Sequence, residues 1–366
     1  MKMKPLFGRF KEERFEDLSS DYLTKQIINL NGRKNKQLSF INESVVKVKE
    51  VIGKKKLDVL DGFSGSGIVS RLFKHHSNIL YANDLENFST VLNQCYLRNR
   101  EEVDKVHLQQ LVDNLNETAM GGNVRGFIED IYSPKNDIKI KKGERAVFTN
   151  ENAKIIDSIR QNIDKLATDD EKPFLIAPLI VAVSKRSNVP GVYRAFYTDS
   201  TTGLGSFHIG AGNYKRVSKR ISIELPEFSS FSCQARIFNQ DINELIKNLP
   251  EVDLAYFDPP FDVYSYGEDY FMYNTVAKYE RPTEITLVAG VPLNWNRSMY
   301  NSSTKALKAL TELLENTRAK YILLSYNSKG IIPKNVLVEV CKRYGTVSVV
   351  ENSKTVFDYL ISIKVK

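Results

Sequence analysis

A strand, a glycine-rich turn and a helix follow one another between residues 57 and 73. Residues 57–61, Leu-Asp-Val-Leu-Asp, predict a strand, and the glycines at 62, 65 and 67 predict a turn whose backbone can approach a ligand closely. The helix expected from residue 68 begins with free N–H groups. This order is typical of open α/β folds, in which ligands bind outside the carboxyl ends of the strands.

The turn departs from the fingerprint of dinucleotide-binding proteins. Its glycines are spaced Gly-x-x-Gly-x-Gly rather than G-x-G-x-x-G, and an acidic residue, Asp61, lies inside the turn. A carboxylate there would repel a pyrophosphate but could hold an ammonium group. The turn therefore predicts a site for an adenosine-containing cofactor that carries an ammonium group.

A second apolar strand, expected at 78–85, ends in Asp84 about twenty residues after the turn. This spacing is the one expected for an acidic residue that accepts hydrogen bonds from ribose hydroxyls. Alternatively, Asp84 or a neighbour caps the helix expected at 85–98. The two roles are compatible.

Residues 256–261 read Tyr-Phe-Asp-Pro-Pro-Phe, at the end of a buried strand expected at 251–257. Asp258 can accept a hydrogen bond from an exocyclic amine, Pro259 and Pro260 stiffen the turn, and Phe261 can stack on the ring that bears the amine. The combination suits a base held outside a duplex. An ordinary turn after a strand is the alternative, because short motifs match by accident.

These motifs, in this order, resemble the S-adenosylmethionine-dependent DNA adenine-N6 methyltransferases of the D12 class, which place the cofactor motif first and the recognition region in the middle. The resemblance implies that Asp258, Pro259, Pro260 and Phe261 are catalytic. The cofactor residues implied are Asp61, Phe63, Ser64, Gly65 and Gly67 in the turn, Asp84 and Leu85 after the second strand, and Leu30, Gly32 and Lys34 in an N-terminal segment. Leu30 stands where some members have an aromatic residue.

Asp241 precedes the catalytic strand and has two interpretations. The resemblance implies that it faces the adenine of the cofactor, and the apolar spacing of Ile242, Leu245 and Ile246 indicates equally that it caps a helix. The resemblance also implies that Tyr326 and Asn327 are pocket walls, with a core strand and polar turn as the alternative. Tyrosines at 264, 266, 270 and 273 could line the pocket or pack.

The predicted architecture is an α/β, Rossmann-like methyltransferase sheet of seven mostly parallel strands with helices on both faces. The N-terminal part of the catalytic domain is expected at 1–125, an inserted target-recognition region at 126–235, and the C-terminal part at 236–366. Helices are expected at 149–166 and 172–187, and a last strand at 355–363 in an edge or antiparallel position.

The segment 188–220 mixes glycine, aromatic and basic residues, which suits DNA. Lys215, Arg216, Lys219 and Arg220 would contact phosphates, although a solvated basic loop is the alternative. The net charge of +8 favours a polyanionic partner without proving one. Double-stranded DNA is therefore the predicted partner.

The remaining composition limits the class of protein. Three cysteines and four histidines are scattered without metal-ligand spacing, so no metal site is expected. No signal peptide or apolar span appears, which predicts a cytoplasmic protein of bacterial or phage type. A monomer is expected, and a cognate restriction endonuclease is left open as a partner.

The resemblance implies methyl transfer from S-adenosylmethionine to N6 of a flipped adenine, in a restriction-modification system or as an orphan modification. Cytosine-N4 methylation is the nearest rival, because that family uses the same pocket but usually has serine in place of Asp258. RNA guanine methylation is a more distant rival, because asparagine commonly takes the place of Asp258 in those enzymes. A catalytically silent DNA-binding subunit is the rival from another class, and the intact motifs argue against it.

Overall fold

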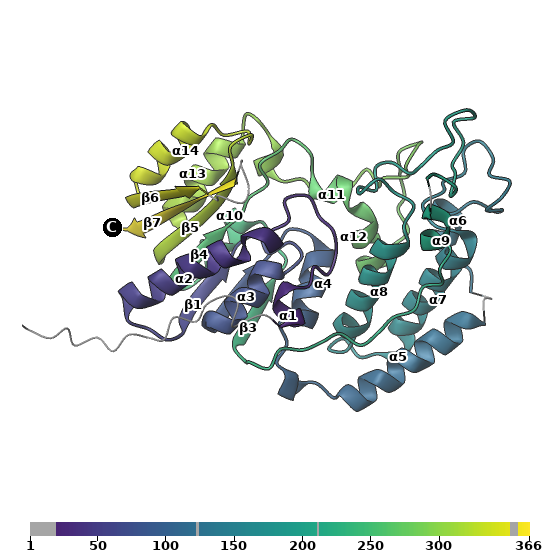
Figure 1. Ribbon diagram of the computed structural model, residues 1–366, viewed down its shortest axis with the longest axis horizontal. Helices are drawn as coiled ribbons and strands as arrows, with labels where there is room; N and C mark the ends of the chain where they lie inside the picture. Colours follow the sequence, from purple (N-terminus) through teal and green to yellow (C-terminus); the bar gives the residue numbers. More distant parts are fainter. Residues whose placement is uncertain (1–19, 122–123, 211, 352–357) are drawn as a thin grey trace, which may run out of the picture.

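The computed structural model describes residues 20–121, 124–210, 212–351 and 358–366, and Figure 1 shows its course. The described strands form one seven-stranded sheet in the order β3-β2-β1-β4-β5-β7-β6. Their bounds are β1 Leu57–Asp61, β2 Ser77–Asn83, β3 Gln234–Phe238, β4 Val252–Phe257, β5 Ala319–Asn327, β6 Gly345–Glu351 and β7 Asp358–Val365. The predicted seven-stranded α/β sheet is confirmed.

The strands from β3 to β5 are all parallel, whereas β7 runs antiparallel between β5 and β6. The expected last strand is therefore antiparallel, as one of its two alternatives had it, but it is not at an edge. Its first three predicted residues, 355–357, lie outside the described residues. Every residue of the central strand β4 is buried, as expected for a parallel strand covered on both faces, and all of its residues except Asp253 are apolar or aromatic.

Helices cover both faces of the sheet because side chains alternate across each strand. Val59 packs with α2 (Leu38–Ile52) and α3 (Ile68–His76), whereas the next residue, Leu60, packs on the opposite face. That face is covered by α10 (Ile242–Leu245), α13 (Ala306–Asn316) and α14 (Lys334–Lys342). The predicted two-sided covering is confirmed.

A second apolar core lies beside the sheet and is made by helices (Figure 1). They are α4 (Asn87–Tyr96), α5 (Lys105–Met120), α6 (Phe127–Tyr132), α7 (Asn150–Leu166), α8 (Lys172–Arg186) and α12 (Phe271–Lys278), with the short α9 (Asn213–Val217) packed on α8. The predicted helices at 149–166 and 172–187 are α7 and α8. Thr149 caps α7 by accepting a hydrogen bond from the Asn152 N–H.

The helical core draws on three parts of the chain. Helix α5 packs on α7, and α12, which follows the predicted catalytic motif, packs on both α4 and α8. The helical region is thereby tied directly to both halves of the sheet domain.

The remaining described helical elements are α1 (Asp21–Thr24), η2 (Asn35–Gln37), η3 (Arg100–Glu102), α11 (Tyr266–Asp269) and η4 (Met299–Asn301). Within the described chain, no helix has the length and apolar character of a membrane span.

Candidate active site

The carboxyl ends of four adjacent parallel strands meet at one edge of the sheet, where a cleft opens. Asp241, Asp84 and Asp258 follow β3, β2 and β4, and Asp61 is the last residue of β1. The predicted residues that line this cleft are Leu30, Gly32, Lys34, Phe63, Ser64, Gly65, Asp84, Leu85, Asp241, Asp258, Pro259, Pro260 and Phe261. Asp61 and Gly67 lie next to it, and the Asp61 side chain is buried. Motifs that are far apart in the sequence thus form one site.

The glycine turn needs its glycines for two different physical reasons. Gly67 has φ +75° at the start of α3, and its N–H donates to the Ser64 carbonyl at 2.8 Å. A Cβ on Gly67 would lie 2.7 Å from Asn93 Oδ1, and one on Gly62 would lie 2.7 Å from the Phe257 ring. The turn therefore combines a left-handed backbone with close packing against α4 and β4.

We expect Gly67→Ala to destabilise the fold and weaken cofactor binding. The left-handed backbone alone costs roughly 1 kcal/mol for a residue with a Cβ, and the Asn93 contact adds to it. Gly53→Ala is the matched control, because Gly53 has φ +76° and a Cβ added there would meet nothing within 4 Å. Denaturant unfolding should show a larger loss for Gly67→Ala than for Gly53→Ala. Equal losses would contradict the role of the Asn93 contact.

Asp61 is fully buried beneath the turn. Its Oδ2 accepts a hydrogen bond from the Ser70 hydroxyl at 2.6 Å, whereas its Oδ1 is buried without a hydrogen-bond partner among the described residues. Burial raises the pKa of the Asp61 carboxyl to about 7, the Ser70 hydrogen bond lowers it, and the carboxylates of Asp258 and Asp84 raise it further. An unpaired buried acceptor is costly, so this site favours a ligand that brings a donor or a positive charge.

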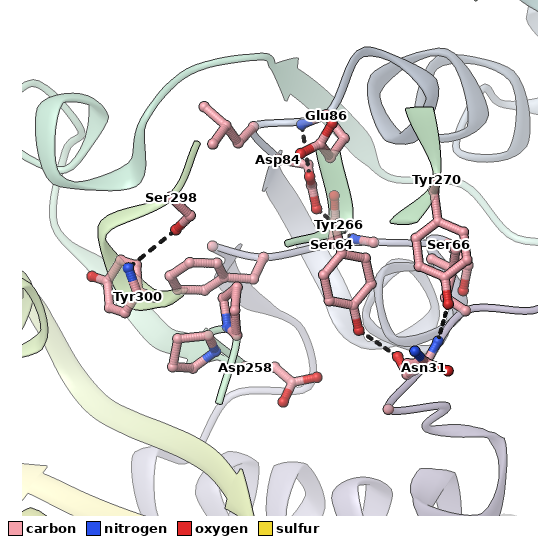
Figure 2. A pocket seen from close by; sticks show the side chains of 18 of the residues that line it. Asn31, Ser64, Ser66, Asp84, Glu86, Asp258, Tyr266, Tyr270, Ser298 and Tyr300 are labelled. Carbon is pink, nitrogen blue, oxygen red and sulfur yellow. Dashed lines mark hydrogen bonds between the residues drawn. The ribbon is translucent and has the colours of Figure 1, made fainter. Parts of the chain in front are cut away.

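Asp84 ties the second strand to the glycine turn. One carboxylate oxygen accepts from the Gly65 N–H at 2.7 Å and the other from the Glu86 N–H at 2.9 Å (Figure 2). Burial raises the pKa of the Asp84 carboxyl. Helix α4 begins at Asn87 with Glu86 at its N-cap position, and the Glu86 side chain makes no capping hydrogen bond. The capping alternative is therefore met neither by Asp84, which lies two residues before the N-cap position, nor by the Glu86 side chain.

Glu86 is a cleft residue that the sequence interpretation missed. It is buried, lines the cleft, and accepts hydrogen bonds from the side-chain amides of Asn274 at 2.5 Å and Asn296 at 3.1 Å. Burial raises the pKa of the Glu86 carboxyl to about 7, although the Asn274 hydrogen bond lowers it. Its only sequence signal was its place two residues after Asp84, at the end of the same strand.

Asp258 begins the turn after β4 and faces the cleft (Figure 2). Its Oδ1 forms an ion pair with Lys34 Nζ at 2.8 Å, and both side chains are largely buried. Burial raises the pKa of the Asp258 carboxyl, and the Lys34 ammonium opposes this increase. Lys34 was expected to contact the cofactor, and the structure places it on the candidate catalytic carboxylate.

Phe261 is half-buried and packs edge to face on Tyr326, with ring centroids 6.4 Å apart. Tyr326 is itself buried, and its hydroxyl accepts from the Ile332 N–H at 3.2 Å. Asn327 donates to Asp358 at 2.8 Å. Neither residue lines the cleft, so the pocket-wall expectation was wrong and the core-strand alternative holds. Tyr326 instead supports the ring of Phe261 from behind.

Two tyrosines after the catalytic motif hold the N-terminal segment over the cleft. The Tyr270 hydroxyl accepts from the Asn31 N–H at 2.7 Å, and the Tyr266 hydroxyl donates to the Asn31 carbonyl (Figure 2). Gly32 has φ +75°, and a Cβ there would lie 3.3 Å from the Tyr266 hydroxyl. Tyr264 also lines the cleft, whereas Tyr273 is packed in the helical core.

We expect Lys34→Met to lower methyl transfer and move its acid limb to higher pH. Because the ammonium lowers the pKa of Asp258, its loss raises that pKa, and a larger fraction of the carboxyl is then protonated at a given pH. The pH profile of single-turnover transfer measures this. Exposed Lys36 offers the control Lys36→Met. An unshifted profile for Lys34→Met would argue against the ion pair in the active form.

Asp241 satisfies both of its predicted interpretations in geometry. Its side chain caps α10 by accepting from the Asn243 N–H at 2.8 Å, and it also lines the cleft beyond β3. The cap fixes the carboxylate at the edge of the site. A role toward a cofactor remains a prediction.

The four basic residues predicted to contact phosphates differ in their surroundings. Arg216 donates to the carbonyls of Lys185 and Ser187 at 3.1 and 2.9 Å, and Arg220 pairs with Glu151. Lys215 and Lys219 are exposed. Arg216 therefore holds the loop to the end of α8, and the two lysines remain the better candidates for phosphate contacts.

The model of the D12 class N6 adenine-specific DNA methyltransferases matches residues 31–340, which span the cleft and the helical region. The chain belongs to this family. The sheet is thus that of a Rossmann-like methyltransferase.

Three curated relatives illustrate the family. The modification methylase LlaI of Lactococcus lactis subsp. lactis is 29% identical over 87% of this chain and 49% of its own length. The type II methyltransferase M.NlaIII of Neisseria lactamica is 30% identical over 80% of this chain and 81% of its own. The type II methyltransferase M.CviAII of Paramecium bursaria Chlorella virus 1 is 28% identical over 90% of this chain and 93% of its own length. The chain thus spans about half of LlaI but most of the other two.

Proposed function

We propose that this D12-class chain is a site-specific DNA methyltransferase that transfers a methyl group from S-adenosylmethionine to N6 of an adenine flipped out of duplex DNA. The observation that carries the proposal is the shared cleft: Asp258 and Phe261 face the same space as the glycine turn and Asp84. A carboxylate beside an aromatic plate suits an aminopurine, and the turn suits an adenosine-containing cofactor.

The residues present fit S-adenosylmethionine. Asp61 Oδ1, which has no partner within the described chain, provides an acceptor for the ammonium of the methionine part, and Asp84 lies where ribose hydroxyls would be bound. Leu30, Gly32, Leu85 and Asp241 line the same cleft. The bound cofactor would supply a methyl group on a positively charged sulfur.

The chain's own residues bind and orient the adenine. Flipping costs a few kcal/mol, which stacking and hydrogen bonds in the pocket offset. Phe261 provides the stacking face, and Asp258 with the Pro259 carbonyl accepts hydrogen bonds from N6, which directs its lone pair at the methyl group. The N6 amine would receive the methyl group that the cofactor supplies, and the N6 proton would pass to the Asp258 carboxylate and then to solvent. Positioning is the main catalytic device.

Lys34 has a defined part in this scheme. Its ammonium neutralises Asp258 while no amine is present, at the position from which the N6 amine must approach. The incoming amine takes over one acceptor position on the carboxylate, and Lys34 keeps the carboxylate ionised. The site is thus prepared for a neutral amine rather than for a cation.

The wider assignment follows from the relatives' names and the predicted regions. Residues 126–235 would supply most of the target recognition, with Lys215 and Lys219 on phosphates. The relatives are named modification methylases and type II methyltransferases, which supports a restriction-modification role with or without a cognate endonuclease. We propose a monomer acting in the cytoplasm.

Transfer of labelled methyl groups tests the substrate class. The proposal predicts incorporation into mixed-sequence duplex DNA and not into RNA, together with a thermal shift on addition of S-adenosylmethionine. A chain that binds duplex DNA without any thermal shift or incorporation would instead be a silent DNA-binding subunit. Incorporation into RNA alone would overturn the proposal.

A further inference from the structure

An exposed apolar hairpin projects from the chain between the candidate active site and the helical region. Residues 284–293 form it, with the Thr286 N–H donating to the Val291 carbonyl and the Leu293 N–H to the Glu284 carbonyl, at 2.9 and 3.0 Å. At its tip Leu287 is 93% and Val288 73% exposed. Apolar side chains this exposed at the tip of one hairpin indicate a contact surface.

The hairpin is held rigidly by the helical region. Arg145 donates to the carbonyls of Thr286, Leu287 and Val288 at 2.9–3.2 Å, so one guanidinium fixes the whole tip. The Tyr132 hydroxyl donates to the Gly290 carbonyl at 2.9 Å. A flexible surface loop would not need a charged side chain bound to three of its carbonyls. The exposed tip is therefore preorganised.

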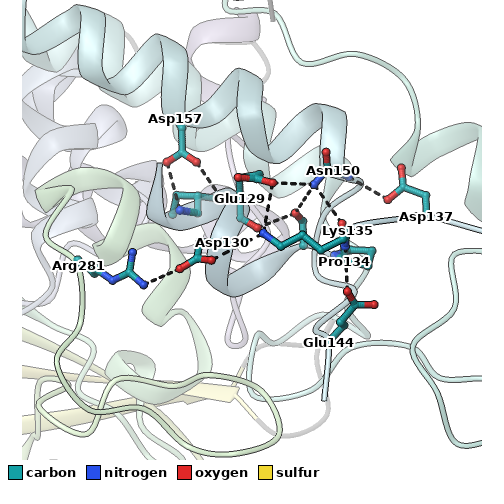
Figure 3. Close-up of polar contacts among 11 residues, drawn as sticks. Glu129, Asp130, Pro134, Lys135, Asp137, Glu144, Asn150, Asp157 and Arg281 are labelled. Carbon is teal, nitrogen blue, oxygen red and sulfur yellow. Dashed lines mark hydrogen bonds and ion pairs between the residues drawn. The ribbon is translucent and has the colours of Figure 1, made fainter. Parts of the chain in front are cut away.

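A lysine-rich loop, residues 135–144, ends beside Arg145 and is also held by hydrogen bonds to its backbone. In Figure 3 the Asn150 amide donates to Glu129 and to the Pro134 carbonyl at 3.1 Å, and Glu144 accepts from the backbone N–H of Lys135. Glu144 also accepts from the backbone N–H of Lys141 at 2.7 Å. Arg281, just before the hairpin, pairs with Asp130 of α6 at 2.5 Å (Figure 3). The loop and the hairpin are thus anchored to the same helix.

The lysine loop presents charge and another apolar tip to solvent. Lys139, Lys141 and Lys142 are exposed, and their side chains have no ion-pair or hydrogen-bond partner among the described residues, whereas Lys135 of the same loop pairs with Glu129. Ile138 is 85% exposed beside them. Unpaired lysines next to an apolar tip match a polyanion with grooves, because ammonium groups neutralise phosphates and apolar side chains insert between bases.

The hairpin connects directly to the active-site cleft. Asn296, three residues beyond it, bonds to Glu86 at the cleft, and Ser298 lines the cleft itself. In Figure 1 the loops around α6 and α9 reach the same upper side of the molecule as α11, which follows the catalytic motif. A duplex presenting a base to Asp258 would thus extend toward the hairpin 284–293 and the lysine loop 135–144, which we call the two prongs.

We propose that the hairpin 284–293 and the lysine loop 135–144 form a joint contact surface for duplex DNA beside the flipped base. Leu287 and Val288 enter a groove as an apolar insertion, and Lys139 and Lys141 hold the flanking phosphates. This inference rests on the proposed function and adds a contact that lies partly outside the region 126–235. Arg145 acts as a positioning residue that links the two prongs.

Duplex binding measured against salt concentration tests the surface in the full-length chain. Leu287→Ala with Val288→Ala should weaken binding about tenfold with little change in the salt slope, because the lost contact is apolar. Lys139→Ala with Lys141→Ala should reduce the slope of log K against log salt by about two. Controls are Val106→Ala, which is 72% exposed on α5, and Lys47→Ala with Lys55→Ala around the C-terminal part of α2.

The outcomes separate this inference from the proposed function. Wild-type chain that methylates duplex DNA, with both prong variants binding as tightly as the controls, would overturn the inference and leave the function standing. Wild-type chain that neither binds nor methylates duplex DNA would overturn both. Unchanged thermal stability and cofactor binding in the prong variants, expected because the side chains are exposed, exclude misfolding as the cause of weaker binding.

Discussion

Asp258→Ala should abolish methyl transfer while leaving the protein folded and able to bind its cofactor. The Asp258 carboxylate lies in the same motif as Phe261 and can orient an exocyclic amine, so its loss should lower kcat by at least about 10²-fold, the size seen when one positioned group is lost. Asp258→Asn keeps an acceptor oxygen without its charge and should be intermediate. Single-turnover transfer from labelled cofactor measures both.

A buried aspartate on the strand that precedes Asp258 gives the control. Asp253 lies near the other end of β4 and pairs with Lys54 and Lys320 at 2.7 and 2.8 Å. Asp253→Asn should reduce stability but not the rate of transfer by folded protein. If Asp253→Asn lowered the rate as much as Asp258→Ala does, the effect would report damage to β4 and not chemistry at Asp258.

Asp61→Asn should weaken cofactor binding and remove part of its pH dependence. The Asp61 carboxyl has a pKa raised to about 7, mainly by burial, and an ammonium ligand favours its ionised form. Below pH 7 the ligand must therefore displace a proton, so affinity should fall by up to about tenfold per pH unit. A hydrogen bond to a charged group is worth about 1.5–3 kcal/mol, which is roughly 10- to 100-fold in affinity.

Calorimetric titration with S-adenosylmethionine between pH 5.5 and 8 would measure this difference. Burial also raises the pKa values of Asp84 and Glu86, so the wild-type profile contains their contributions. The difference between wild type and Asp61→Asn isolates that of Asp61. Equal pH dependence in the two proteins would show that Asp61 only supports the turn through Ser70 and does not meet the cofactor.

The sequence predicted which residues gather at the cleft where a motif follows a parallel strand. Asp61, Asp84, Asp241 and Asp258 were each identified from a strand followed by a turn, and parallel pairing necessarily brings such ends to one edge. The alternation of the last strand predicted an edge or antiparallel position, and β7 is antiparallel but not at an edge. These features are local, so the periodicity of a short segment reveals them.

Features that depend on contacts between distant segments were not predictable. The Lys34–Asp258 ion pair joins residues from opposite ends of the catalytic domain, and Glu86 acquires its place through Asn274 and Asn296. Tyr326 was misjudged because a polar strand end looks the same whether it faces a pocket or packs behind Phe261. The exposed hairpin is held from the helical region through three of its carbonyls, and no sequence pattern signals such a contact.

Nucleoside mass analysis of duplex DNA after incubation with S-adenosylmethionine tests the central claim most directly. Wild-type chain should produce N6-methyladenine, and Asp258→Ala, run in parallel at matched cofactor saturation, should produce none. N4-methylcytosine in place of N6-methyladenine would contradict the adenine assignment. N6-methyladenine formed equally by Asp258→Ala would contradict the mechanism built on the Asp258–Phe261 cleft.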